Sequence, residues 1–197
     1  MFHFSAGKIR DMLKNKYGFA NLLFYAAALA LAGIVKLYYR QEEGFPGHPL
    51  LMLFLKPLSR ITGLFFGIPF EFDAAKGFYN SDLHVVIGSS CAGINFFVIV
   101  LCMLVFTFIK RFRPLLLKTA AFAAFIALSY AASLLANASR IIASITILEM
   151  RILPVGTNME LVHQFTGILF YLFYLICGFY LAKIILSKAG SIYEASA

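Results

Sequence analysis

Long apolar runs alternate with short polar stretches along the chain. Four of these runs come close to the roughly 20 residues that a helix needs to cross the hydrocarbon core of a bilayer. They cover residues 19–37, 92–109, 115–136 and about 161–186. The pattern predicts an all-α polytopic membrane protein, a single integral membrane domain over residues 1–197 with four clear transmembrane helices.

Two further apolar segments carry charges, and whether they cross the membrane stays open at this point. Residues 50–70 have Lys56, Pro57 and Arg60 near their middle. A charged side chain at the bilayer centre costs at least roughly 2.5–3.5 kcal/mol, which favours an interfacial or re-entrant helix. Residues 141–153 likewise end in charged positions before a proline.

The most polar stretch of the chain lies between residues 71 and 84. The segments 70–73 and 84–87 at its two ends are apolar and β-branched or aromatic in part. Such composition is typical of strands, so these two segments are predicted to pair as short strands.

Composition and charge agree with a lipid environment. Hydrophobic residues make up 61% of the chain and charged residues only 13%, with a mean hydropathy of +0.85, whereas a soluble domain is about a quarter charged. The net charge of +8 comes from Lys and Arg clusters between apolar runs, which argues against a nucleic-acid partner. Three cysteines at irregular spacing fit neither a disulfide framework nor a zinc site, and no cofactor is predicted.

The basic clusters also predict an orientation in the membrane. Cytoplasmic loops are rich in Lys and Arg, which puts the N-terminus, the KRFRP sequence at 110–114 and the C-terminal lysines inside. With four spans, the second span begins at the outward face, the third ends there and the fourth begins there. Cys91, Arg140 and His163 stand at these three points, so they are predicted to lie together.

Cys91 is the candidate nucleophile. It stands in SSCAGINFF at a predicted helix start, where unpaired N–H groups and the helix dipole favour the thiolate. Gly93 leaves room for another backbone or a substrate chain, and Asn95 is expected one turn on, on the same helix face as Cys91. The alternative is a buried structural cysteine, which is also the expectation for Cys102 and Cys177 in mid-span.

Arg140 is the candidate electrophilic residue, and Asn137 in the same NASR sequence is a supporting candidate. The guanidinium suits the stabilisation of an oxyanion or the binding of a substrate carboxylate. The alternatives are snorkelling to the headgroups and an ion pair with Glu149 or Glu160.

His163, in the first turn of the predicted last span, is the candidate acid/base for a cysteine nucleophile. An interfacial histidine bonded to a backbone carbonyl is the alternative. His84 is closer to Cys91 in sequence and is the competing base.

Three sequence blocks resemble those of the exosortase/archaeosortase family of prokaryotic membrane proteins. They are CAGINFF, NASRI and VHQFTGILFYLF, in the family's order over roughly residues 80–180. The short length favours a compact member such as the exosortase K group. The resemblance implies a cysteine protease or transpeptidase of a prokaryotic plasma membrane. Its substrates would be proteins with a C-terminal sorting signal made of a short motif, a transmembrane helix and a basic tail. By position the resemblance implies Cys91 as nucleophile, Arg140 as electrophilic or positioning residue and His163 as acid/base, with water or another acceptor resolving the thioester.

Other function classes have less support in the sequence. A membrane phosphatase would need companions to the FRP at 112–114, which is predicted to lie inside. A thiol oxidoreductase needs paired cysteines, whereas Cys91 and Cys102 would be about 16 Å apart at 1.5 Å per helical residue. The non-enzymatic alternative is a small membrane adaptor or transporter subunit, which predicts an unreactive Cys91 and a tolerated substitution of His163.

Overall fold

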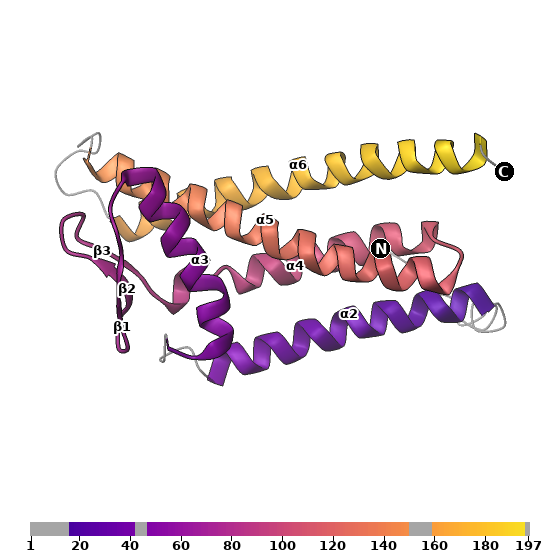
Figure 1. Cartoon of the computed structure of the whole chain (residues 1–197), viewed down its shortest axis with the longest axis horizontal. Coiled ribbons are helices and arrows are strands. Elements are labelled where there is room, and N and C mark those ends of the chain that lie inside the picture. The colour runs from indigo at the N-terminus through magenta and orange to yellow at the C-terminus, as the bar shows by residue number, and fades with distance from the viewer. Residues whose placement is uncertain (1–15, 42–46, 150–158, 196–197) are drawn as a thin grey trace.

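The computed structural model describes residues 16–41, 47–149 and 159–195 of the chain. Five helices within these residues are long and apolar enough to cross a membrane. They are α2 (Lys16–Gln41), α3 (Pro49–Phe66), α4 (Ile94–Phe108), α5 (Leu115–Glu149) and α6 (Met159–Ala195). By length and composition, the number of candidate transmembrane helices is therefore five, and not the four that were clear from the sequence. Four of the helices run along the long axis of the molecule, while α3 runs across one end of this bundle (Figure 1).

α4 lies at the centre of the bundle. It packs against α5, α2 and α6, and its buried side chains include Phe96, Leu101 and Val105. A helix that is apolar all round needs neighbours on several sides, and α4 has them. The outer faces of α2 and α6 instead carry many exposed leucine, isoleucine and phenylalanine side chains. Apolar surface on this scale marks a region that contacts lipid or another protein.

α5 is one continuous helix through the NASR sequence. It runs from Leu115 to Glu149, so Arg140 lies within the helix and not beyond its end. The predicted helix end near residue 136 is therefore wrong, and residues 141–149 of the separately predicted segment 141–153 belong to the same helix. Residues 150–153 lie outside the described residues. This stretch has no proline or glycine and is rich in alanine, so nothing breaks the helix where polar residues appear.

α3 is capped by a side chain at its N-terminus and by a glycine at its C-terminus. The Nδ1 of His48, its N-cap residue, accepts a hydrogen bond from the Leu50 N–H at 3.3 Å, and a proline stands at the start of the helix. Gly67 ends the helix in the left-handed conformation, at φ 71°. Lys56 and Arg60 are exposed, so the charges that argued against a full span point away from the core.

A three-stranded antiparallel sheet lies at the same end of the molecule as α3 (Figure 1). Its strands, in spatial order, are β1 (Glu71–Asp73), β2 (Gly77–Asn80) and β3 (Val85–Ile87). The two predicted strands are present, but the predicted pairing is wrong because each of them pairs with β2 and not with the other.

The turn between β1 and β2 explains the missed strand. Asp73 Oδ1 accepts hydrogen bonds from the backbone N–H groups of Lys76 at 2.9 Å and of Ala75 at 2.8 Å. This side-chain cap turns the chain within three residues, so that β2 starts at Gly77 inside what the sequence suggested was a polar loop. The same two bonds, first that from Lys76, lower the pKa of the Asp73 carboxyl.

Candidate functional site

Cys91 ends a short turn that leads into α4. It is the last residue of the 3-10 turn η1 (Ser89–Cys91), and its side chain is 7% exposed. Gly93 follows with φ 70°, and α4 begins only after it. The predicted helix start at Cys91 is therefore wrong. Because the left-handed Gly93 interrupts the helical path, Asn95 does not lie one turn above Cys91 on a shared face, and its side chain is exposed.

Gly93 lets α4 and α5 approach closely at this point. Its carbonyl accepts a hydrogen bond from the Ser133 hydroxyl at 2.8 Å. A Cβ at Gly93 would overlap the Asn137 side-chain amide, and it would lie 2.7 Å from Asn137 Cγ and 2.9 Å from Ser133 Oγ. Both the space and the positive φ thus require glycine. Two supporting candidates, Gly93 and Asn137, are in contact and connect the segment that carries Cys91 to α5.

Arg140 extends from α5 towards α6, and its side chain is 8% exposed. Its guanidinium carbon lies 5.6 Å from the centroid of the Tyr171 ring on α6. Gly167 makes room for it, because a Cβ there would lie 3.3 Å from Arg140 Cδ and 3.5 Å from Nη1. Arg140 Nε and Nη2 are buried and have no hydrogen-bond partner among the described residues; the side chains of Glu149 and Glu160 lie outside them. Buried charged donors without a partner are costly, so an oxygen that accepts hydrogen bonds from them would be bound favourably.

Tyr171 joins these groups and was not among the candidates from the sequence. Its hydroxyl donates a hydrogen bond to Asn137 Oδ1 at 2.6 Å. Its ring stacks on Phe96 of α4, with centroids 4.7 Å apart and an angle of 14° between the planes. The Cys91 thiol and the Arg140 guanidinium both lie close enough to Tyr171 to interact with it electrostatically. In the sequence this tyrosine stands in the apolar run FYLFYLI, where its spacing of one turn after a glycine was the available signal.

The two candidate histidines, His163 and His84, stand in different elements of the structure. His163 lies near the start of α6, one turn before Gly167, and its side chain lies outside the described residues. His84 is exposed in the turn between β2 and β3 with φ 53°, and its Nδ1 lies 3.3 Å from the Asp82 carbonyl oxygen. The whole of β3 separates His84 from η1 and Cys91.

The three cysteines are free thiols in three different environments. Cys91 is buried, Cys102 is half-buried and Cys177 is exposed. The prediction of a buried structural cysteine is therefore wrong for Cys177, whose side chain is exposed on α6. Within residues 16–41, 47–149 and 159–195, no three His, Cys, Asp or Glu residues form a group that could hold a metal ion.

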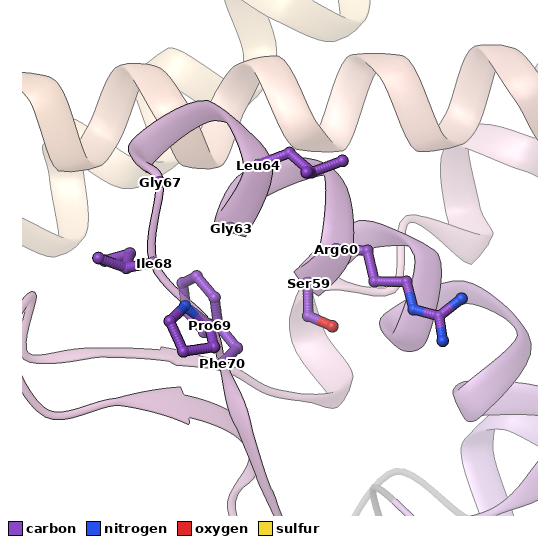
Figure 2. Close-up of a pocket in the computed structure, with 8 residues that line it drawn as sticks. All are labelled: Ser59, Arg60, Gly63, Leu64, Gly67, Ile68, Pro69 and Phe70. Carbon is purple, nitrogen blue, oxygen red and sulfur yellow. The ribbon is translucent and has the colours of Figure 1, made fainter.

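A cavity of about 610 Å³ lies beside the C-terminal end of α3 (Figure 2). It is lined by Ser59, Arg60, Gly63, Leu64, Gly67, Ile68, Pro69 and Phe70. The Arg60 side chain extends away from Ile68, Pro69 and Phe70, so the opposing walls are mainly apolar (Figure 2). Neither Cys91 nor Arg140 is among the residues that line this cavity.

Comparisons with protein-family models, with curated proteins and with solved structures find no match for the chain. The function therefore has to be inferred from the residues themselves. Around Tyr171, where α4, α5 and α6 pack together, the chain gathers a buried thiol, a buried guanidinium with two nitrogens that lack a partner among the described residues, and a tyrosine hydroxyl. A thiol is a nucleophile and a guanidinium stabilises negative charge, which together suit attack on a carbonyl group.

Proposed function

We propose that this chain is a membrane-embedded cysteine protease or transpeptidase of the exosortase type. It cuts proteins that carry a C-terminal sorting signal made of a short motif, a transmembrane helix and a basic tail. The observation that carries the proposal is the Arg140 guanidinium, which is buried with Nε and Nη2 unpartnered among the described residues. A carbonyl oxygen that becomes an oxyanion is the ligand that such preorganised donors fit.

The reaction follows from the groups at the site. His163 takes the proton of the Cys91 thiol, the thiolate attacks the scissile carbonyl carbon, and Arg140 stabilises the oxyanion that forms. The C–N bond then breaks, a thioester remains on Cys91, and His163 protonates the departing amine. Water or another acceptor nucleophile attacks the thioester and releases the thiol. The position of His163, one turn before the glycine that contacts Arg140, supports this assignment.

The proposed topology has four spans, with α3 lying at the outer interface. The start of α2, the α4–α5 connection and the end of α6 lie at one end of the bundle, and the sheet and α3 lie at the other (Figure 1). The KRFRP sequence, part of which forms η2 (Ile109–Arg111), belongs to the first of these ends. Lys110, Arg111 and Arg113 stand together in this connection, and a basic cluster in a short connection favours the cytoplasmic side there. The site then faces outward, and a substrate helix reaches it laterally through the lipid.

The test is co-expression with secreted proteins that carry a C-terminal sorting signal, followed by measurement of the substrate's mass. Wild type and Cys102→Ala are expected to cleave, and Cys91→Ala is not. Cys102→Ala is the matched control because it removes another thiol from the same region of the chain. Arg140→Gln is expected to slow cleavage by about 10²–10³-fold, as removal of an oxyanion donor does. Equal processing by wild type and Cys91→Ala would overturn the proposal.

Thiol labelling separates this proposal from the non-enzymatic alternative. In intact cells a small membrane-impermeant thiol reagent is expected to modify Cys91, which is 7% exposed, slowly but measurably. Wild type that cleaves none of several sorting-signal substrates, with a Cys91 that stays unmodified, would instead favour an adaptor or transporter subunit.

A further inference from the structure

We infer that Tyr171 is a positioning residue, which holds Arg140 and the Cys91 segment in one fixed arrangement. The inference rests on the proposed function, because it assigns Tyr171 a role in the reaction of that site. Tyr171 connects the three helices that pack together at the site. It stands on α6, its ring stacks on Phe96 of α4, and its hydroxyl bonds to Asn137 of α5.

A chain of hydrogen bonds runs from Tyr171 towards Cys91. The Tyr171 hydroxyl donates to Asn137 Oδ1 at 2.6 Å, and Asn137 Nδ2 donates to the Ser133 carbonyl at 3.1 Å. The Ser133 hydroxyl donates to the Gly93 carbonyl at 2.8 Å, two residues from Cys91. Asn137 and Ser133 are fully buried, so water cannot reach them to replace a lost hydrogen-bond partner. The orientation of the Asn137 amide, and with it the surface against Gly93, therefore depends on the Tyr171 hydroxyl.

The ring of Tyr171 also holds the Arg140 side chain. The guanidinium carbon lies 5.6 Å from the ring centroid, a cation–π contact. A carboxylate partner would hold the same charge by accepting hydrogen bonds from its nitrogens. The aromatic face attracts the charge without accepting any of them, and Nε and Nη2 are in fact unpartnered within the described residues. Tyr171 thus fixes Arg140 while its donors stay open to a substrate oxygen.

The stacking on Phe96 makes this ring rigid. The two rings lie 4.7 Å apart at 14°, and the Phe96 side chain is 2% exposed. A ring that is packed on one side and bonded at its hydroxyl has little freedom to turn. Preorganisation of this kind matters because a misplacement of about 1 Å at a reacting group can cost about 10²-fold in rate.

Tyr174 provides a matched control one turn further along α6. Its hydroxyl also makes a hydrogen bond from α6 to α5, at 2.7 Å from Ser139 Oγ. Its ring contacts that of Phe173, and neither of these interactions involves Asn137 or Arg140. Tyr174→Phe and Tyr171→Phe therefore remove equivalent bonds between the same two helices, and only the second one alters the site.

The experiment compares the two variants with wild type, using the sorting-signal substrate found to be cleaved in the mass assay. Tyr171→Phe keeps the ring but loses the hydroxyl, and its kcat is expected to fall about tenfold with KM within about twofold. Tyr171→Leu also loses the ring, and its kcat is expected to fall about 10²-fold. Tyr174→Phe is expected to stay within about twofold of wild type in both constants. Thermal midpoints of the two Phe variants serve to show that they lose similar stability.

A second measurement does not depend on cleavage. In a Cys102→Ser, Cys177→Ser background, the rate of Cys91 alkylation by iodoacetamide reports how firmly its segment is held. Tyr171→Phe is expected to raise this rate about threefold, because local opening exposes the buried thiol, and Tyr174→Phe is not.

The outcomes are distinguishable. If Tyr171→Phe and Tyr174→Phe behave alike in alkylation, Tyr171 does not position the site and the inference is wrong. A rise in KM with kcat unchanged would also overturn it, because the hydroxyl would then act in substrate binding. If wild type cleaves no substrate, the proposed function fails, and the alkylation rates alone decide whether Tyr171 holds the Cys91 segment.

Discussion

The substitution Gly93→Ala tests the close approach between the Cys91 segment and α5. Gly93 has φ 70°, a left-handed conformation that costs other residues about 1–2 kcal/mol. The added methyl group would overlap the Asn137 amide and lie 2.9 Å from Ser133 Oγ. Overpacking of this kind typically costs about 1–3 kcal/mol. The hydrogen bond from Ser133 to the Gly93 carbonyl would also be strained, at a further cost of about 1 kcal/mol.

A total loss of about 3 kcal/mol or more is therefore expected for Gly93→Ala. For a chain of this length, each 1 kcal/mol lowers the thermal midpoint by about 2–4 °C. The midpoint in a single detergent should thus fall by about 6–12 °C, measured by differential scanning fluorimetry.

Two other glycines provide the control for this prediction. At Gly33 in α2 and Gly178 in α6, an added methyl group would meet no atom of the described residues within 4 Å, so Gly→Ala is free of steric conflict there. Alanine is favoured over glycine inside a helix by about 0.5–1 kcal/mol, and these variants should be unchanged or slightly more stable. A double-mutant cycle with Asn137→Ala should show a coupling of about 1–3 kcal/mol between positions 93 and 137. If Gly93→Ala unfolds at the same temperature as Gly33→Ala, the close approach described for Gly93 is wrong.

Three further predictions concern other parts of the fold. Tyr130→Phe removes the 2.6 Å hydrogen bond from the Tyr130 hydroxyl to the Leu53 carbonyl, which joins α5 to α3, and should lower stability by about 1 kcal/mol in the same thermal assay. Thr62→Val should raise stability by about 1 kcal/mol, because the buried Thr62 hydroxyl has no partner among the described residues; a lower midpoint would show that the hydroxyl is bonded after all. The Asp73 carboxyl has a pKa below its ordinary 3.8, so the β1–β2 turn should be fully stable above that pH and loosen as the pH falls through the lower, folded pKa. Hydrogen exchange in this turn should show that dependence, and Asp73→Asn should abolish it.

The helices could largely be predicted from the sequence, and their limits could not. α2, α4 and α6 follow from apolar runs of spanning length, which need no knowledge of tertiary contacts. The end of α5 was predicted too early because Arg140 and its polar neighbours suggested an interface, whereas an alanine-rich stretch without proline or glycine stays helical. β2 was missed because a turn capped by the Asp73 side chain needs only three residues. The stretch is also polar, which is more typical of a loop than of a strand.

At the candidate site, the types of residue could be predicted from the sequence, and their geometry could not. Chemical character singled out Cys91, Arg140 and Asn137, and a glycine in CAGINFF suggested a close approach. Asn95 was misjudged because a left-handed residue before α4 cannot be read from a helical spacing. Tyr171 was missed because its role depends on stacking and bonding between three helices, and single-chain patterns do not record which helices meet.

The length of α5 gives it the properties of a lever. Arg140 lies 25 residues after Leu115, the first residue of the helix, which is about 37 Å at 1.5 Å per residue. Helices adjust their tilt to bilayer thickness, and a change of about 5° would displace the far end of such a rod by about 3 Å. The contacts of Gly93 with Ser133 and Asn137 attach the Cys91 segment to α5 within about two turns of Arg140, so both would be carried together. Under the proposed function, a thicker or thinner membrane would then change which peptide bond of the substrate meets the thiol, while the arrangement of the reacting groups stayed the same.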